Sequence, residues 1–80
     1  MTKVKLKNSL MLDGKELKEI ELRRPKVRDR LAVERSKSSD AEKEVQLIAN
    51  LSELPIEVIE EMDLSDYAKI QQELSNFLSE

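Results

Sequence analysis

The segment from Ile20 to Leu31 constrains the fold of this 80-residue chain more than any other stretch. A strand pattern ends in it at a proline, and a helix pattern begins directly afterwards. Pro25 fixes φ near the helical value and lacks the amide hydrogen that the first turn of a helix leaves unpaired. Asp29 is the one acid among five nearby cations, which are Arg23, Arg24, Lys26, Arg28 and Arg30. We therefore expect Arg24, Pro25 and Asp29 to form a structural junction between an upstream hairpin and downstream helices.

A β-hairpin is predicted before this junction, because apolar and polar residues alternate there with the period of a half-buried strand. The apolar residues of the first run are Val4, Leu6, Leu10 and Leu12. Asp13-Gly14 supplies the two positive φ angles that a tight hairpin turn requires. The return strand runs from Leu17 to Leu22, and a two-residue turn sets Leu17 opposite Leu10. Ile20 and Leu22 have the opposite parity, which predicts either a one-residue bulge near Lys18-Glu19 or a longer turn.

Helical patterns follow the junction. A first helix is expected from Pro25 to about Arg35, with Val27 and Leu31 facing inward. A serine-rich linker, 36–39, leads to a second helix over 41–52, with Asp40 as its N-cap. Its apolar face is made of Val45, Leu47, Ile48 and Leu51. Pro55 then opens a shorter third helix, whose inward residues are expected to be Ile56, Ile59 and Met62.

A fourth helix is predicted from Leu64 to about Leu78. Asp63 is its expected N-cap, and Asp66, at the third helical position, is expected to accept amide hydrogen bonds as a second helix-capping residue. The sequence therefore predicts one small α+β domain over 1–80, composed of a β-hairpin (1–24) and a helical part (25–80) with three or four short helices.

Composition argues against catalysis. The chain has no histidine, no cysteine and one glycine, so it lacks the commonest general base, the thiol nucleophile and a glycine-rich phosphate loop. The pairs Glu60–Glu61 and Asp63–Asp66 have the oxygen donors of a magnesium or calcium site, but helix capping accounts for the second pair. We predict no catalytic residue, no metal and no cofactor. No apolar run reaches the roughly 20 residues of a membrane span, and no signal-peptide pattern opens the chain, so the expected location is cytoplasmic.

Charge is distributed unevenly along the chain. Residues 1–37 have twelve Lys/Arg and six Asp/Glu, whereas residues 38–80 have two and eleven, so the net charges of +6 and −9 sum to −3. This asymmetry is compatible with nucleic-acid binding, with homo-oligomerisation, or with pairing between the two halves. No aromatic residue lies among the cations to stack on bases. We therefore favour pairing of Arg24 and its neighbours with the acids of residues 57–66, and nucleic acid is the weaker interpretation.

The apolar stripe of the last helix has two interpretations. Packing against the hairpin accounts for Tyr67, Ile70 and Leu74. Phe77 and Leu78 lie close to the end of the chain, where an exposed apolar surface would suit docking of another protein's helix. We expect Leu74, Phe77 and Leu78 to contact a partner.

Two parts of the chain resemble the small tail assembly chaperones of long-tailed bacteriophages, in particular the E-protein family with a member in Mu-like phages. The first part is Leu22-Arg23-Arg24-Pro25 with the following helix and its Asp29, although the family often has threonine where this chain has Lys26. The second is the segment 47–78, with its Leu-Ile-Ala-x-Leu, Pro-x-x-Val/Ile and Met-Asp-x-x-Asp-Tyr steps and a closing Phe-Leu. The resemblance covers about three quarters of the chain, and most of its motifs are short steps of hydrophobic spacing.

The resemblance implies a non-catalytic protein of the bacterial host cytoplasm that binds the tape-measure protein and keeps it soluble while the tail tube forms. It also implies a longer form of the same protein, made by ribosomal frameshifting, as a further partner. The alternative from composition is a small DNA-binding regulator of a phage or mobile element that uses the basic N-terminal half.

Overall fold

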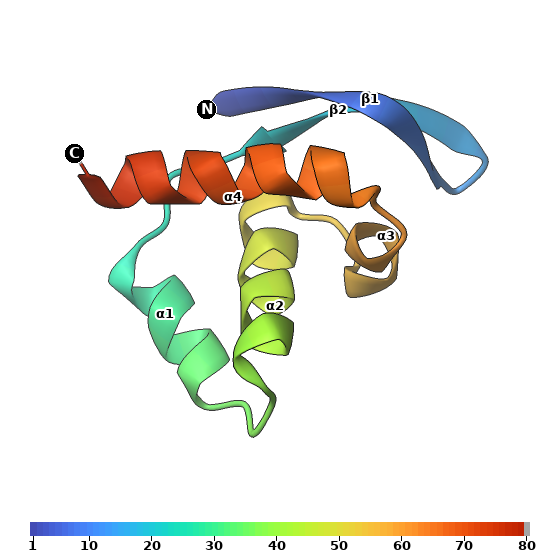
Figure 1. The fold of residues 1–80 in the computed structure, drawn as a ribbon. Helices are drawn as coiled ribbons and strands as arrows, with labels where there is room; N and C mark the ends of the chain where they lie inside the picture. The colour runs from blue at the N-terminus through green and yellow to red at the C-terminus, as the bar shows by residue number, and fades with distance from the viewer. Residues whose placement is uncertain (80) are drawn as a thin grey trace.

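The computed structural model describes residues 1–79 and has a β-hairpin followed by four helices (Figure 1). The elements are β1 (Thr2–Leu12), β2 (Lys15–Leu22), α1 (Val27–Glu34), α2 (Asp40–Ser52), α3 (Ile56–Glu60) and α4 (Leu64–Ser79). The predicted α+β fold, with its hairpin first and its helices afterwards, is confirmed. None of the helices within residues 1–79 is long and apolar enough to cross a membrane.

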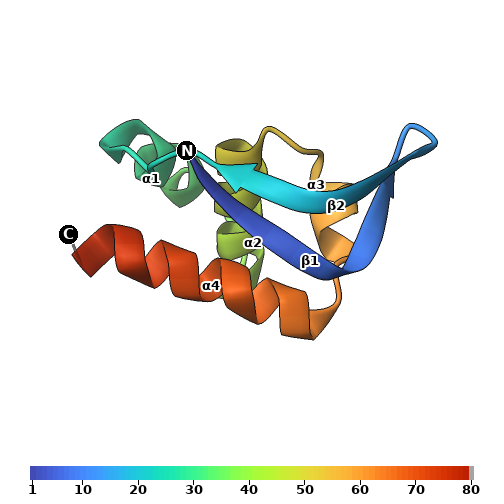
Figure 2. The same cartoon turned by 90° about the horizontal axis from the view of Figure 1, so that it is seen from above.

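The hairpin forms one layer and the helices form the other. In two perpendicular views α4 lies alongside β1, while α2 runs away from the hairpin between α1 and α3 (Figures 1 and 2). The turn of the hairpin projects beyond α3, and the two ends of the described chain lie at the opposite end of the molecule (Figure 1). One face of a two-stranded sheet is therefore covered by helices, which is the arrangement that such a small sheet needs for stability.

The turn of the hairpin has the predicted conformation. Asp13 and Gly14 both have positive φ, at 51° and 78°, so they form the two-residue turn that matches the twist of the strands. Leu10 lies opposite Leu17, as expected.

The irregularity in the register lies at the predicted level of the hairpin, beside Lys18, but the extra residues are in β1 and not in β2. Lys5 pairs with Glu19 and Leu10 pairs with Leu17, so residues 6–9 of β1 lie opposite Lys18 alone. With the extra residues in β1, Val4 and Leu10 are buried together with Ile20 of β2. The extra residues are held from outside the sheet, by a side chain of α4 described below.

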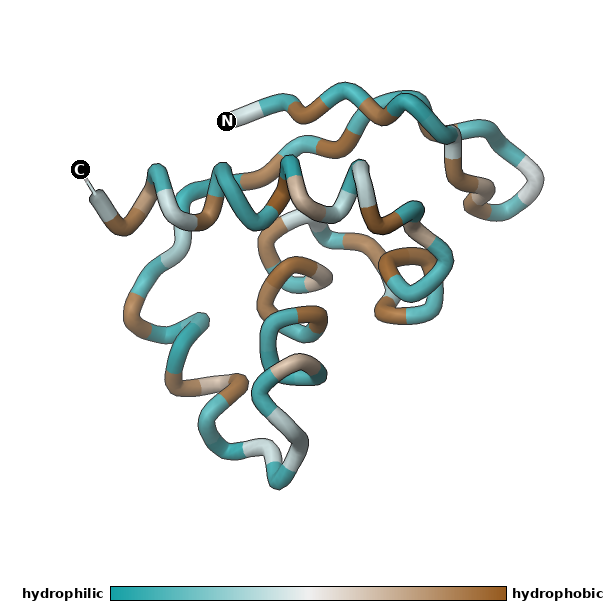
Figure 3. Tube along the Cα trace, in the orientation of Figure 1, coloured by the Kyte–Doolittle hydropathy of each residue, from teal (hydrophilic) through white to brown (hydrophobic). Residues whose placement is uncertain are grey.

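A hydrophobic core joins the hairpin to three of the helices. Its buried members come from both strands, from α2, α3 and α4, and from the turn after α3; they are Val4, Leu10, Ile20, Leu22, Ile48, Ala49, Leu51, Ile59, Met62, Ile70, Leu74 and Phe77. Figure 3 shows hydrophobic and hydrophilic stretches alternating along the strands and helices, as expected for elements with one face in a core. Helix α1 contributes no residue to this core cluster.

The helix boundaries are close to those predicted, with differences at the N-termini. Ser39, not Asp40, caps α2: its Oγ accepts a hydrogen bond from the amide of Glu42 (3.2 Å), and its own amide donates to the Glu42 carboxylate (3.1 Å). This reciprocal pair is a capping box, and it makes Asp40 the first helical residue. In α3 and the turn after it, Ile59 and Met62 are buried as predicted, whereas Ile56 is exposed.

Candidate functional site

The junction between hairpin and helices is built around Asp29, which is 4% exposed. Its two carboxylate oxygens accept hydrogen bonds from Nη1 and Nη2 of Arg23, at 2.8 and 2.6 Å, in a bidentate ion pair. The backbone amide of Lys26 donates to the same carboxylate at 2.7 Å. These bonds lower the pKa of Asp29 to about 2; the Arg23 guanidinium has the larger effect and the Lys26 amide the smaller one. The amide of Arg23 also donates to the carbonyl of Leu51 in α2 (3.2 Å). Arg23, which directly follows β2, therefore bonds to both α1 and α2.

This ion pair decides which face of α1 points inward. Asp29 and Val33 are the buried residues of α1, one helical turn apart. The prediction that Val27 and Leu31 face inward is wrong: they are 76% and 50% exposed. The reason is that Asp29 must meet Arg23 at the end of β2, and this rotates the residues of the opposite face toward solvent.

The sequence analysis did not include Arg23 among the residues of the junction, although Arg23 forms its central ion pair. The spacing from Lys26 to Asp29 is that of an N-cap and an acid at the third helical position, which indicates an acid that accepts an amide bond. Nothing in the sequence distinguishes which of the two neighbouring arginines completes the pair. Arg23 pairs with Asp29 in the same half of the chain, not with an acid of residues 57–66 as predicted.

Arg24, the next residue along the chain, contacts the C-terminal part of α4. Its guanidinium carbon lies 5.5 Å from the centre of the Phe77 ring, within the range of a cation–π contact. The fold thus brings the junction next to the C-terminal part of α4, two sites that the sequence analysis treated separately.

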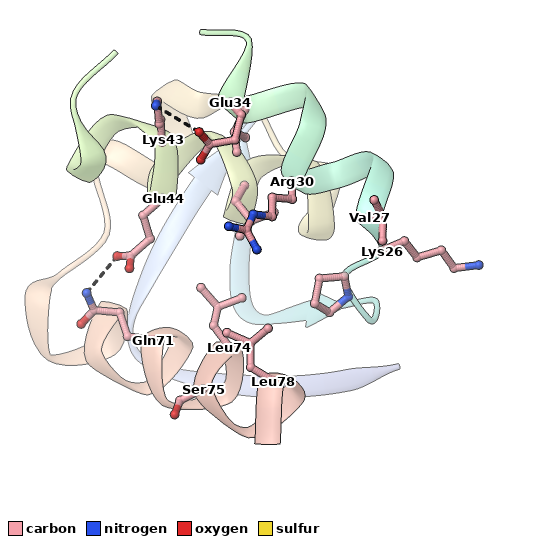
Figure 4. A pocket seen from close by; sticks show the side chains of 13 residues that line it. Lys26, Val27, Arg30, Glu34, Lys43, Glu44, Gln71, Leu74, Ser75 and Leu78 are labelled. Atoms are coloured by element: carbon pink, nitrogen blue, oxygen red, sulfur yellow. Dashed lines mark hydrogen bonds and ion pairs between the residues drawn. The ribbon is translucent and has the colours of Figure 1, made fainter. Parts of the chain in front are cut away.

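An apolar groove opens between α1, α2 and α4 and has a volume of about 720 Å³. Figure 4 shows Leu74 and Leu78 of α4 pointing into it from one side, with α1 on the other. The apolar residues that line the groove are Pro25, Val27, Val33, Leu47, Leu74 and Leu78. This volume lies within the range of roughly 300–1,000 Å³ that is typical of ligand sites in proteins.

Charged and polar side chains surround the groove, and several of them are paired. Lys43 of α2 lies 3.6 Å from the carboxylate of Glu34 on α1. Glu44 accepts hydrogen bonds from the hydroxyl of Tyr67 (2.8 Å) and from the side-chain amide of Gln71 (2.9 Å). Burial, together with the hydrogen bond to Glu44, raises the pKa of Tyr67. These contacts hold α2 against α1 on one side and against α4 on the other, so the groove has a preformed shape.

The three residues expected to contact a partner differ in exposure. Leu74 and Phe77 are each 9% exposed and belong to the hydrophobic core, while Leu78 is 82% exposed. The expected apolar surface at the end of α4 therefore consists of Leu78 and the edge of Leu74 that reaches the groove. Phe77 is on the core side, against Arg24.

The two expected capping residues also have different surroundings. Asp63 precedes α4, and its carboxylate accepts hydrogen bonds from the amide (2.8 Å) and hydroxyl (2.6 Å) of Ser65, which hold the pKa of Asp63 below its usual value. The carboxylate of Asp66 does not bond as the helix cap that was predicted. It is fully buried and accepts hydrogen bonds from the amides of Lys7 (2.8 Å) and Asn8 (2.9 Å) in the irregular part of β1.

The Asp66 carboxylate therefore satisfies two amides that the register shift frees from the strand ladder. These two bonds lower the pKa of Asp66, and Nζ of Lys69 lies 3.3 Å from the same group. The bonds of Asp66 link residues almost 60 positions apart, which is why no local pattern indicates them. Within residues 1–79, no cluster of three or more acidic side chains is placed to hold a metal ion.

A small α+β domain with an open apolar groove between helices has the features of a protein-binding module. Comparison with known families identifies the family of this chain. Residues 3–79 match the family described as "phage tail assembly chaperone proteins, E, or 41 or 14", so the chain belongs to the phage tail assembly chaperones. The match covers nearly the whole chain and confirms the resemblance noted in its motifs. No curated protein and no solved structure matches the chain.

Proposed function

We propose that this protein binds the tape-measure protein of a phage tail and keeps it soluble while the tail tube assembles. The observation that carries the proposal is the family match over residues 3–79. In this proposal the protein acts without catalysis, in the cytoplasm of the bacterial host. A longer form made by frameshifting would present the same groove and would be a second component of the complex.

The groove supplies a physical means for such binding. Long helical proteins aggregate through their apolar stripes when these are exposed. Leu78, at 82% exposure, and the neighbouring edge of Leu74 form an apolar surface at the mouth of the groove. Covering a partner's apolar stripe there removes it from water, and the open shape of the groove allows later release to the growing tail.

The test is co-expression with the tape-measure protein of the same phage, followed by a pull-down at low and high salt. We expect a soluble complex that survives high salt, because apolar burial is not screened by ions. The tape-measure protein alone should precipitate. No complex would refute the proposal. Binding of DNA that weakens steeply with salt would favour the regulator that uses the basic N-terminal half.

A pair of leucines on α4 provides a matched control. Leu78 and Leu64 are both 82% exposed and lie at opposite ends of this helix, and Leu78 alone of the two lines the groove. Leu78→Asp should abolish capture, and Leu64→Asp should leave it unchanged. Equal effects of the two substitutions would place the binding surface elsewhere.

A further inference from the structure

We propose that the groove between α1, α2 and α4 recognises an amphipathic helix with an acidic residue beside its apolar stripe, and that Arg30 contacts this acid. The inference rests on the proposed function and specifies the chemistry of the partner segment. It follows from the walls of the groove and from the distribution of charge around it.

The walls of the groove favour a helix over an extended segment. All of its lining residues except Pro25 and Lys26 belong to helices, whose backbone groups are bonded within the helix. An extended peptide needs a strand edge with free backbone donors and acceptors, and the groove contains no strand. A helix bonds its own backbone and needs only apolar contact. Leu74 and Leu78, spaced one turn apart on α4, offer that contact along one wall.

Arg30 determines the charge that the occupant should have. Its side chain points from α1 into the groove, above Leu74 (Figure 4). Glu34 lies one turn further along α1, but its carboxylate pairs with Lys43. Among residues 1–79 no carboxylate lies within ion-pair distance of the Arg30 guanidinium.

The remaining charges make this end of the groove positive. Lys26 lines the same end, while Glu44, toward the other end, is bonded to Tyr67 and Gln71. An acid on the incoming helix would therefore find its complement at Arg30. Guanidinium–carboxylate pairing in a site from which the partner excludes water would fix the register and direction of that helix.

The test measures binding of the tape-measure protein to charge-reversed variants of the full chain. Arg30→Glu should weaken binding about tenfold, because reversal replaces attraction by repulsion. Arg28→Glu is the matched control: Arg28 is also an exposed arginine of α1, but it does not line the groove. We expect the control to stay within about twofold of the wild type. Arg30→Gln should weaken binding less than Arg30→Glu, since it removes the attraction without adding repulsion and leaves the apolar contacts.

A second experiment identifies the acid on the partner. A photo-reactive amino acid at position 75, on the rim of the groove, should cross-link one segment of the tape-measure protein. The inference requires an amphipathic helical pattern with an Asp or Glu beside its apolar stripe in that segment. Reversing this acid to Arg should restore binding to the Arg30→Glu variant and weaken binding to the wild type.

The outcomes separate this inference from the proposed function. Capture by the wild type with no loss in Arg30→Glu would leave the function intact and overturn the role of Arg30. Equal losses in Arg28→Glu and Arg30→Glu would indicate a general basic field and also overturn it. A dimer of this chain that Arg30→Glu dissociates would make a second copy the occupant. Absence of any capture by the wild type would refute the function and the inference together.

Discussion

Phe77 and Leu78 are neighbours in sequence but should respond very differently to truncation. Phe77 is 9% exposed, packs in the core and lies under the guanidinium of Arg24 at 5.5 Å. Phe→Ala in a core costs about 3–5 kcal/mol. Phe77 lies two residues before Ser79, the last residue of α4, and the end of a helix can relax around a cavity. We therefore expect a loss at the lower end of that range, about 3 kcal/mol, which includes the loss of the cation–π contact.

Such a loss is large for this chain. A domain of this length is stable by about 4–12 kcal/mol, so Phe77→Ala should remove a quarter or more of the free energy of unfolding. The thermal midpoint should fall by roughly 12–24 °C. Circular dichroism during heating and during urea titration measures both quantities.

Leu78→Ala is the internal control for this experiment. Leu78 is 82% exposed, and exposed substitutions of this kind stay within about 0.5 kcal/mol. The proposed function adds that this control variant should nevertheless bind the tape-measure protein more weakly. If Phe77→Ala unfolds at the same urea concentration as the wild type, the burial of this ring in the core is refuted.

Three further predictions concern the hairpin and the junction. Asp66→Asn should lower the urea midpoint by about 1 M. The amides of Lys7 and Asn8 bond to different oxygens of the Asp66 carboxylate, and in Asn one of these two atoms becomes an NH2 group, which cannot accept. The matched Asp63→Asn should change the midpoint little, since Asn is an equally good N-cap. Asp29→Asn should lower the free energy of unfolding at pH 7, and by progressively less as pH falls from about 4 toward 2. The pKa of Asp29 is depressed to about 2 in the folded protein, so the stability that its carboxylate contributes is lost through that range. A difference in unfolding free energy between variant and wild type that stays constant across this pH range would contradict the ion pair. Gly14→Ala should lower the free energy of unfolding by about 1 kcal/mol through the positive φ alone, because an added Cβ would meet no neighbouring atom. Gly14→Asn should lower it less, since Asn adopts positive φ more readily than Ala. Equal urea midpoints for these two variants would show that the positive φ does not set the cost.

Local features of the fold could be predicted because they depend on neighbouring residues. The Asp13-Gly14 turn needs two positive φ angles, and these residue types supply them. The α4 helix begins at Leu64, as Asp63 indicated, and Ile59 and Met62 are buried where the spacing placed them.

The errors occurred where a contact with another element overrides the pattern within a helix. Val27 and Leu31 have the apolar character of a buried pair, but the ion pair of Asp29 with Arg23 turns them outward. Asp66 has the position of a helix cap, but its carboxylate serves amides of β1. In both cases a buried carboxylate must be satisfied, and its partners are set by packing.

The sequence by itself determined the order of hairpin and helices, the absence of histidine and cysteine, and the motifs of a tail assembly chaperone. Those properties follow from residue type, spacing and local backbone preference. Only the tertiary structure decided which leucine at the end of α4 is exposed, which arginine binds Asp29 and where the groove opens. These depend on how α1, α2 and α4 pack together, because burial and ion pairing are properties of residues that meet in space.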